Sequence, residues 1–483
     1  MKRCALLFSL LTCLSTAQDL SCGELEGLAL RPMTEHKALV EGIANEVKSR
    51  ETQLVSLKRG RGQGHTVRQY GYKEGTTQVD VSGLDQIVSL STLAEDSPFR
   101  ERGAVASAVA ESAVTMEQLV TTLLPQGLVP CVVPEFRMIT VGGAIQGLAA
   151  ESTSHRFGLF HDQALDYELI LGDGEVITAA PEGDYSSLFY AIPGSYGSLA
   201  ILSSATIALC PAMERVSLEL TRFPSVPALM EHFGSTHGAE IMFQEGIGYG
   251  PKELLAIEGR YCRQGIDCPA TEKSFDSFLS PWFFEAVRSY EKAGLLTFSV
   301  PTEEYLFRHD RGAFWMASYK IPSLIGRILG PLLSTRRMFE LSSSPYLKWA
   351  FPRHTIMLQD FMLPHAQVAS FTEYLDDKLA LWPLWFLPMR NEQTPQHIMS
   401  LPHSVGPYTN VGSYGQPRSS YDYVPDNIDM ERVLSAKNGR KVFYSHAYYS
   451  KEEFAALYDM ETYGKLRKQY GGAEAFRSVE EKV

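Results

Sequence analysis

The chain has 483 residues, enough for about three folding units. Apolar residues make up 45% and charged residues 21%, a globular composition that excludes a disordered or collagen-like chain. The 44 Lys and Arg against 56 Asp and Glu give a formal net charge of −12. This charge offers no general attraction for nucleic acid or for an anionic membrane, so no nucleic-acid partner is expected.

The chain begins with a leader-like segment. Lys2 and Arg3 precede an apolar run from Ala5 to Leu14, and Ser15-Thr16-Ala17 supplies small residues suited to signal peptidase. The run is shorter than the about 20 apolar residues that cross a bilayer. We therefore expect residues 1–17 to be a secretory signal; a retained membrane anchor and an organelle leader are the alternatives.

Helix and strand patterns interleave from about residue 35 to Pro211. Leu39, Ile43 and Val47 have helical spacing, Thr115 is typical of a helix N-cap, and Gly172-Asp173-Gly174 is typical of a hairpin turn. We expect helices over 35–50 and 116–128, and strands over 53–57, 79–81, 104–110, 166–171 and 175–178.

The pattern of residues and of predicted elements changes beyond Pro211. We expect strands over 215–220 and 240–247, and helices over 226–234 and 271–293; the Gly246–Gly250 run is interpreted as a turn. Residues 281–388 are rich in aromatics, which fill a core or line an apolar pocket.

Cysteines give a limited signal. Cys262 and Cys268 flank a polar turn and would either pair in an oxidising lumen or remain thiols. The absence of a C-x-x-C pair argues against a structural zinc site, and no metal ligands are predicted.

A basic, glycine-rich loop follows the strand that ends near Leu57. Alternating glycines let the backbone present several N–H groups to one anion, and five Lys or Arg with no acid between Lys58 and Lys73 suit a pyrophosphate. The candidate ligand-binding residues are Gly60, Gly62, Gly64, His65 and Thr66.

A second glycine-rich segment is more specific. Gly142 and Gly143 place no side chain between the backbone and a ligand, so a flat ring can lie there, while Thr140, Ser152, Ser154 and His155 offer polar groups to its edge. A further glycine turn includes Gly197. The candidate residues are Thr140, Val141, Gly142, Gly143, Ala144, Ile145, Gln146, Gly147, Leu148, Ala149, Ala150, Glu151, Ser152, Ser154, His155 and Gly197.

Two clusters of ionisable residues follow in the second half of the chain. Arg308-His309-Asp310-Arg311 would form either an internal salt-bridge node or catalytic groups. Tyr444, His446, Tyr448 and Tyr449 lie in a segment (443–449) expected to be a strand, with His446 and Tyr448 on one face and Tyr449 on the other. The basic, apolar segment 321–351 would either dock on a membrane or pack inward.

The basic glycine loop, then P-E-x4-T-V-G-G-x-I-x-G and S-x-S-H-x-x-G, resembles the FAD-binding PCMH-type domain of the vanillyl-alcohol-oxidase superfamily. Within it, the chain is most similar to the delta(24)-sterol reductases (the DIMINUTO group). The likeness continues through 281–284, 307–315, 381–385, 411–418 and 444–449. The G-Q-G-H-T loop departs from that group, and His65 instead resembles the flavin-linking His of oxidases such as cytokinin dehydrogenases.

The resemblance implies an α+β fold with a two-subdomain FAD-binding domain over 35–212. It also implies a mixed substrate (cap) domain over 213–440, and a segment over 441–483 that returns to the flavin. It implies FAD as cofactor, NADPH as co-substrate, a sterol or other lipophilic substrate, and a membrane-associated place in the endoplasmic reticulum.

Reducing an isolated alkene requires an acid near the flavin, because such an alkene accepts hydride only after protonation. The candidate catalytic residues are Tyr448 and His446, followed by Asp310 and His309. One alternative is an oxidase or dehydrogenase of an alcohol or sugar, with His65 covalently attached to the flavin rather than bonding to phosphate. The other is a flavin- and lipid-binding protein without turnover.

Overall fold

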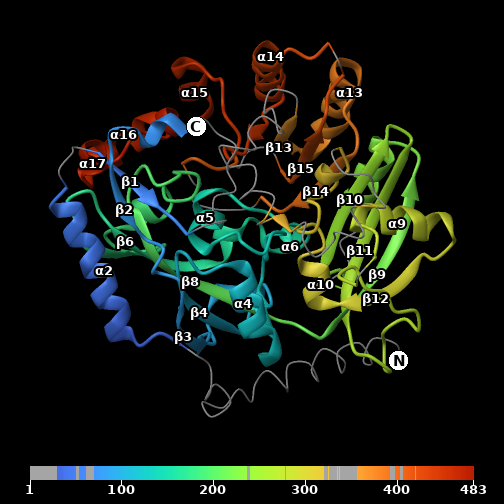
Figure 1. Ribbon diagram of the computed structural model, residues 1–483, viewed down its shortest axis with the longest axis horizontal. Helices are drawn as coiled ribbons and strands as arrows, with labels where there is room; N and C mark the ends of the chain where they lie inside the picture. Colours follow the sequence, from blue (N-terminus) through green and yellow to red (C-terminus); the bar gives the residue numbers. More distant parts are fainter. Residues whose placement is uncertain are drawn as a thin grey trace.

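The computed structural model has mixed helices and sheets, which confirms the predicted α+β class (Figure 1). The predicted leader, the loop residues Gly62, Gly64, His65 and Thr66, and most of 321–351 lie outside the described residues. The structure describes residues 30–483 except 51–53, 61–69, 236–239, 278, 320–324, 326–333, 336, 338–355, 392–397, 403–405 and 419.

The first layer is helix α2 (Met33–Lys48) on a small parallel sheet of β1 (Val55–Lys58) and β2 (Thr77–Asp80). Val40, Ile43 and Val47 are buried against Val55 and Val79 of these strands. The helical spacing of apolar residues therefore predicted this helix, because that spacing forms the stripe that the sheet covers.

A six-stranded antiparallel sheet has the order β3-β4-β8-β6-β7, with β5 paired to β8. The predicted hairpin of β6 and β7 is confirmed, with Gly174 at φ 81° in its turn. The strands are β3 (Ile87–Thr92), β4 (Ala106–Glu111), β5 (Leu128–Pro130), β6 (Ala164–Ile170), β7 (Val176–Ala179) and β8 (Ile201–Pro211).

Short helices surround this sheet. Thr115 caps α4 by accepting a hydrogen bond from the Gln118 amide, as predicted, but α4 ends at Leu123 instead of 128. The chain tightens into a 3-10 turn there because Pro125 has no N–H to continue the helix. The helices are α3 (Pro98–Glu101), α4 (Met116–Leu123), α5 (Val141–Gln146), α6 (Ser154–Phe157) and α7 (Ser186–Phe189).

The described residues contain two disulfides. Cys131, just after β5, bonds to Cys210 in β8, with the two Cα atoms 4.9 Å apart. Cys262 bonds to Cys268, so the pairing alternative for these two residues is confirmed.

An eight-stranded antiparallel sheet forms the other half, in the order β12-β9-β11-β10-β14-β15-β13-β16. Figure 1 shows α5 and α6 lying between this sheet and the six-stranded one, and the Arg390 amide at the end of β14 donates to the Ser154 carbonyl of α6 (2.9 Å). The strands are β9 (Arg215–Phe223), β10 (Phe243–Gly250), β11 (Glu253–Cys262), β12 (Thr297–Pro301), β13 (Met357–Pro364), β14 (Leu384–Met389), β15 (Tyr408–Gly415) and β16 (Arg440–Lys441).

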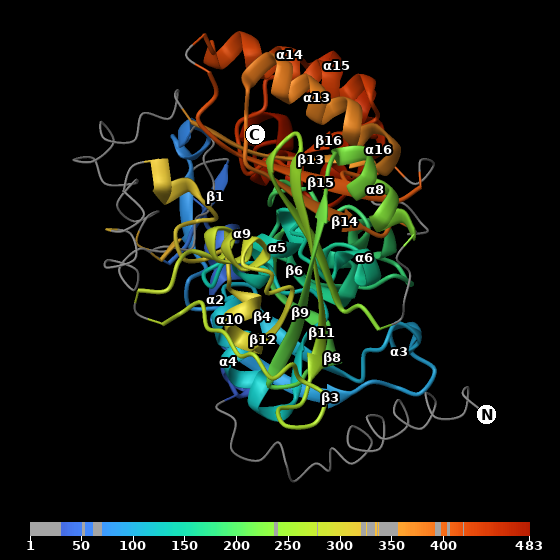
Figure 2. The ribbon, with the colours of Figure 1, turned by 90° about the vertical axis from the view of Figure 1, so that its right-hand side faces the viewer.

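The two faces of this sheet have different neighbours. Phe361, Phe386 and Val411 point to one face, where residues of α8, α13 and α14 bury them (Figure 2). Cross-strand partners share a face, so Asp360, Gly412 and Trp385 all point to the other one. The helices of this half are α8 (Val226–Ser235), α9 (Phe283–Lys292), α10 (Thr302–Leu306), α13 (Val368–Leu379) and α14 (Tyr423–Ala436).

Three local predictions are wrong. Gly246–Gly250 is the end of strand β10 and not a turn; a Cβ on Gly248 would lie 2.7 Å from the Trp382 ring, so the glycine allows close packing. The described residues of 271–282 are not helical, and α9 begins only after Pro281. Residues 443–449 are not a strand.

The last error has a visible cause. The Phe443 amide donates to the Tyr196 hydroxyl (2.9 Å), and the Tyr448 amide donates to the Glu431 carboxylate (2.9 Å). Side chains therefore take the backbone donors that a strand would use, and β16 ends at Lys441.

The C-terminal helices pack on the first half of the chain. Lys482 donates to the Gly197 carbonyl (2.7 Å), and the Tyr463 hydroxyl donates to Ser198 (2.7 Å). These helices are α15 (Lys451–Leu457), α16 (Met460–Gln469), α17 (Gly472–Ala475) and α18 (Val479–Lys482).

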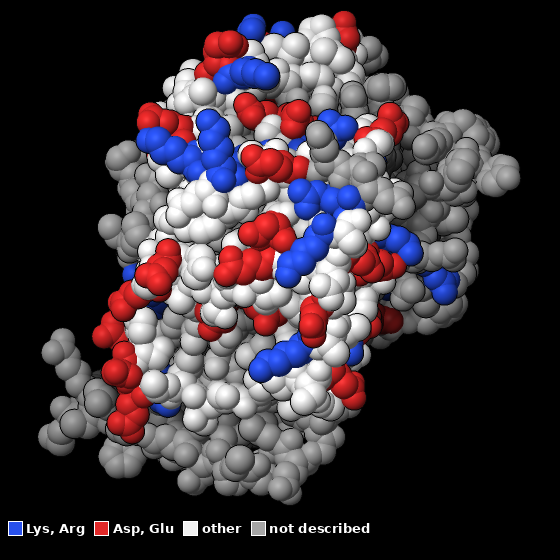
Figure 3. Space-filling view, turned by 90° about the vertical axis from the view of Figure 1, so that its left-hand side faces the viewer, with Lys and Arg blue, Asp and Glu red and all other residues white. Residues whose placement is uncertain are grey.

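On the face shown in Figure 3, acidic and basic side chains are interspersed. Among the described residues, every helix is too short or too polar to cross a bilayer.

Candidate functional site

Helix α5 carries the glycine-rich segment, and its first turn is fixed by its own chain. Thr140 caps the helix by accepting from the Gly143 amide (3.2 Å), and the Gly142 amide donates to the Ser112 carbonyl (2.9 Å). A Cβ on Gly142 would lie 3.0 Å from Ser112. A glycine is therefore required at position 142 for packing on Ser112. The sequence alone did not reveal this reason for the glycine.

The opposite side of the segment is open. Gly143, Gly147, Ala149 and Ala150 are partly exposed, whereas most of their neighbours are buried. The side chains of these residues are a single hydrogen or a single methyl group. The surface that they form therefore leaves room for the flat ring that the sequence predicts here. The Tyr196 hydroxyl, which donates to the Gly147 carbonyl (3.4 Å), borders the same segment.

The polar residues after α5 have partners within the protein. Ser154 accepts from the Glu151 amide (2.9 Å), and the two ring nitrogens of His155 lie 2.9 Å from the Ser152 carbonyl and 3.2 Å from the Ile241 carbonyl. These contacts fix the turn that joins α5 to α6, and they tie it to the chain that leads into β10.

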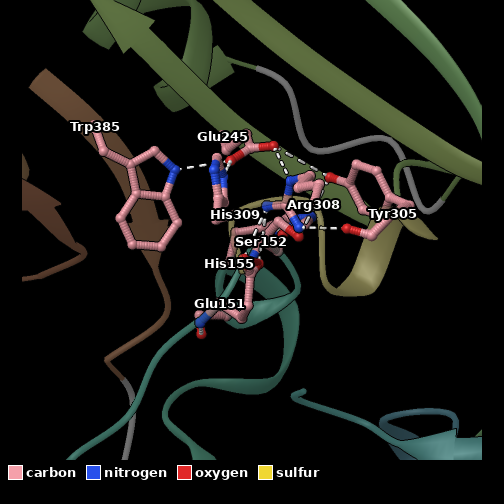
Figure 4. Close-up of polar contacts among 9 residues, drawn as sticks. Glu151, Ser152, His155, Glu245, Tyr305, Arg308, His309 and Trp385 are labelled. Carbon is pink, nitrogen blue, oxygen red and sulfur yellow. Dashed lines mark hydrogen bonds and ion pairs between the residues drawn. The ribbon is translucent and has the colours of Figure 1, made fainter. Parts of the chain in front are cut away.

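A buried ionic network lies beyond this turn, centred on Arg308 (Figure 4). Its guanidinium donates to Glu151 (2.8 Å), to Glu245 of β10 (2.6 Å) and to the Tyr305 carbonyl (2.9 Å). All three guanidinium nitrogens are thus engaged inside the protein. Burial raises the pKa of Glu245, but the charge of Arg308 and the contact with His309 outweigh it, so that this pKa is held well below its ordinary value.

His309 belongs to the same network. Its Nε2 lies 3.1 Å from Glu245, and its ring stacks on Phe314 with centroids 4.0 Å apart. Burial, helped by the charge of Arg308, lowers the pKa of His309 to about 4, so the ring is neutral near pH 7 and donates to the ionised Glu245. A neutral imidazole that already donates its proton is a poor acid for a substrate.

The other members of the predicted cluster are also paired. The Arg137 amide donates to Asp310 (3.2 Å), and Arg311 donates to the Phe275 carbonyl (3.0 Å). Arg308 therefore links the TVGG segment to the eight-stranded sheet through internal ion pairs, as the salt-bridge alternative predicts.

Backbone strain lies beside this node. Ala313 and Phe314 have φ values of 47° and 61°, which is unusual for two successive residues with side chains. The conformation inserts Phe314 between His309, Trp385 and Tyr414, with ring centroids 4.0, 5.0 and 4.7 Å away. Strain of this kind is typical of functional sites.

An acid on the inward face of the sheet, Asp360 of β13, was not among the residues predicted from the sequence. Its Oδ1 accepts hydrogen bonds from Asn410 (2.6 Å) and from the Tyr414 hydroxyl (2.7 Å), both on β15. Burial raises the pKa of Asp360, and hydrogen bonds from Asn410, Tyr414 and Tyr444 oppose this increase. One acid within a largely apolar strand was the available signal.

A second acid was also missed, although it is part of the quoted P-E-x4-T-V-G-G motif. Glu135 precedes Phe136, whose ring packs edge-on against Phe314 (5.8 Å). Burial and the nearby charges of Glu151 and Asp360 raise the pKa of Glu135 well above its ordinary value. Within the described part of the chain, no other residue donates a hydrogen bond to Glu135.

The structure brings His446 and Tyr448 together, with ring centroids 4.8 Å apart, and separates them from Tyr449, which packs with Phe443 and Phe454. The pair lies beside α14, where Tyr448 contacts Tyr423 and its amide is bound by Glu431. Nearby, Lys441 and Glu431 form a buried ion pair (2.7 Å).

Of the basic glycine loop, only Gly60 is described; it follows β1 directly. Gln146 and Gly197 lie close together, since a Cβ on Gly197 would be 3.2 Å from the Gln146 side chain. The glycine turn and α5 are thus neighbours, as a shared site requires.

Comparison with known proteins gives two results. The model of a FAD binding domain matches residues 45–180. The delta(24)-sterol reductase of Rattus norvegicus is 30% identical over 386 residues, covering 77% of this chain and 73% of the relative. That of Pisum sativum is 26% identical over 490 residues, covering 92% and 83%. The decaprenylphosphoryl-beta-D-ribose oxidase of Mycolicibacterium smegmatis is 37% identical over 101 residues, covering 21% and 22%.

Proposed function

This chain belongs to the delta(24)-sterol reductase family, and we propose that it uses FAD to reduce a side-chain double bond of a sterol. One observation carries the proposal: similarity to the rat enzyme covers 77% of the chain, whereas the FAD-binding match covers only residues 45–180. The likeness therefore includes the eight-stranded sheet, where a substrate would meet the cofactor.

We propose two subdomains within the FAD-binding part. The parallel pair β1–β2 with α2 would be the first, and the six-stranded sheet with α4 and α5 the second. The loop after Gly60 and the open side of α5 would then hold the two ends of the cofactor. When bound in its reduced form, FAD supplies a hydride.

The residues of the chain would have three tasks in this reaction. The partly exposed surface of Gly143, Gly147 and Ala150 would seat the ring. Aromatic side chains on the inward face of the sheet, Phe314 and Trp385 among them, would exclude water from the alkene. An acid must supply a proton, because an isolated trisubstituted alkene accepts hydride only at a cationic carbon.

We propose NADPH as the reductant. The test is anaerobic: NADPH is added to the purified yellow protein, and a sterol with an unsaturated side chain is then supplied. Bleaching of the flavin absorbance followed by its return supports the proposal. A flavin that NADPH bleaches and that oxygen, but no unsaturated sterol, reoxidises would contradict it.

That contradicting outcome would favour an oxidase. The observation behind this second candidate is the match of 37% to the mycobacterial oxidase, but the match covers only 21% of the chain. A flavin that stays with the protein pellet after acid precipitation, and moves to the supernatant in His65→Ala, would support the covalent link that accompanies this alternative.

We also propose residence in the secretory pathway, in the endoplasmic reticulum, with the segment 321–351 in contact with the membrane. The disulfides Cys131–Cys210 and Cys262–Cys268 support an oxidising compartment. Fractionation of cells that express the full chain tests the compartment, and flotation with vesicles before and after deletion of 321–351 tests the contact.

A further inference from the structure

Two acids from different parts of the fold approach one aromatic cluster. Glu135 comes from the chain that leads into α5, and Asp360 comes from β13 of the eight-stranded sheet. A series of contacts connects the segments that carry them: Phe136, next to Glu135, packs on Phe314, Phe314 packs on Tyr414 (4.7 Å), and the Tyr414 hydroxyl bonds to Asp360 (2.7 Å). Both acids remain partly exposed although the residues around them are largely buried.

Asp360 also lies close to the open side of the TVGG segment. Met362 lies two residues from Asp360 on β13, and therefore on the same face, and it belongs to an apolar cluster that contains Leu148 and on which Ala150 and Tyr444 pack. The two acids therefore lie where the cofactor-binding segment meets the inward face of the sheet.

The environments of the two carboxyl groups differ in hydrogen bonding. Asp360 accepts from two neutral donors, Asn410 and Tyr414, which favour the ionised form and oppose the increase in pKa that burial causes. Glu135 receives no such donor from the described residues, and it faces the negative charges of Glu151 and Asp360, which the cation of Arg308 only partly offsets. Burial raises the pKa of both acids, but only Asp360 has donors that oppose this increase, so the ionised form is better supported at Asp360 than at Glu135.

We propose that Glu135 is the acid that protonates the alkene and that the ionised Asp360 stabilises the positive charge that then develops on the substrate. The inference rests on the proposed sterol reduction and adds the catalytic residues. Neither acid was among the candidates that the sequence suggested.

The step balances as follows. The O–H bond of Glu135 breaks, and the electron pair of the alkene forms a C–H bond at its less substituted carbon. The more substituted carbon becomes a tertiary cation and accepts the hydride that reduced FAD supplies. Glu135 is left as a carboxylate and recovers its proton from water through its exposed side.

The first test does not depend on turnover. The infrared spectrum of the wild-type protein near pH 7 should contain the C=O stretching bands of protonated carboxyl groups, and the difference spectrum between the wild type and Glu135→Gln should show the loss of one such band. The exposed Glu175, changed to Gln, is the matched control and should leave the band in place. If the band is the same in the wild type and in Glu135→Gln, Glu135 is ionised and the proposal fails.

The second test measures the proton transfer. Glu135→Gln should bind flavin and be reduced by NADPH as the wild type is, while sterol-driven reoxidation slows by about 10²-fold or more. Tyr448→Phe and His446→Ala test the competing assignment, in which this pair supplies the proton. Slow reoxidation in these two variants together with normal reoxidation in Glu135→Gln would assign the proton to that pair and overturn the proposal.

The third test addresses Asp360. A sterol analogue with an ammonium group in the side chain imitates the cation, and the ionised Asp360 should favour it over the neutral, isosteric analogue. Asp360→Asn should lose this preference by about tenfold or more and should bind the neutral analogue normally. An unchanged preference would remove Asp360 from the proposal.

These outcomes are separable from failure of the proposed function. If wild-type reduced flavin is not reoxidised by any unsaturated sterol, the substrate assignment fails, and the infrared band still reports the state of Glu135. If the wild type is reoxidised and Glu135→Gln is equally fast, only the assignment of the acid fails.

Discussion

The Tyr414 hydroxyl reaches Asp360 on the neighbouring strand by lying over Gly412, the residue directly opposite Asp360 in the ladder. A Cβ on Gly412 would lie 2.6 Å from that hydroxyl oxygen, so only glycine leaves room for the bond. The orientation of an acid on one strand thus depends on a missing side chain on the next.

Gly412→Ala should therefore displace the Tyr414 hydroxyl and raise the pKa of Asp360 further, because one of its two hydrogen-bond donors on β15 is lost. We expect a loss of about 1–3 kcal/mol in the free energy of unfolding, as for a buried polar group without its partner. Denaturant unfolding measures this loss. Tyr414→Phe removes the same bond without the added methyl group, so equal effects in the two variants would assign the loss to the bond.

Gly142 and Gly143 should respond differently to substitution. Gly142→Ala should lower stability by about 1–3 kcal/mol, because the new methyl group meets Ser112 at 3.0 Å. Gly143→Leu should remove the flavin at a smaller cost in stability, since among the described residues a Cβ there meets the side-chain hydroxyl of Thr140 (3.1 Å) and no backbone atom of another segment. Flavin absorbance per protein and thermal unfolding of flavin-free protein separate the two effects. Normal flavin content in Gly143→Leu would contradict the placement of the ring.

Arg308→Met should be severely destabilising. It leaves Glu151 and Glu245 buried without their cation, and breaking such a pair costs about 3–5 kcal/mol. Arg288→Met is the control, because Arg288 pairs with Glu253 at a partly exposed position and its loss should have a small effect. Chemical unfolding of the two variants would show the difference, and similar losses in both would argue against the network.

The raised pKa of His36 predicts that the stability of the folded protein depends on pH. It is buried between Glu111 (2.7 Å) and Glu168 (3.0 Å), and hydrogen bonds to these carboxylates raise its pKa from 6.5 to about 9. Because the folded-state pKa is the higher one, the stabilisation is complete below pH 6.5 and is lost as the pH rises through about 9. The difference corresponds to about 3 kcal/mol.

The measurement is the unfolding free energy of the wild type minus that of His36→Gln, followed from pH 6 to pH 10. The difference should shrink between about pH 6.5 and 9. Lys37→Gln, a change at an exposed position of the same helix, should show no such trend. A difference that is constant with pH would mean that His36 is not charged in the folded protein.

Local patterns predicted the parts of the fold that depend on neighbours in sequence. The spacing of Leu39, Ile43 and Val47 sufficed for α2, and Thr115 sufficed for the start of α4, because each feature forms with its own turn of helix. Residues 443–449 alternate as in a strand, yet Tyr196 and Glu431, remote in sequence, capture their amides. No local pattern contains that information.

The candidate site also contains features that a local pattern predicts and features that depend on residues remote in sequence. The TVGG segment could be found because its glycines are consecutive. Asp360 and Glu135 are single acids 225 positions apart, and only the pairing of β13 with β15 and the packing of Phe314 bring their surroundings together. The internal role of Arg308 likewise required the positions of Glu151 and Glu245.

The disulfide between Cys131 and Cys210 closes a covalent loop with a sequence separation of 79 residues. Every candidate flavin-binding residue from Thr140 to Gly197 lies inside that loop. By the chain-entropy relation, closing a loop of this length lowers the entropy of the unfolded chain and so stabilises the folded protein by about 4 kcal/mol. The choice of host for recombinant production therefore matters. Protein made in a reducing cytosol should unfold first in its cofactor-binding half and lose its yellow colour there. Protein made in an oxidising compartment should keep that half folded and keep its flavin.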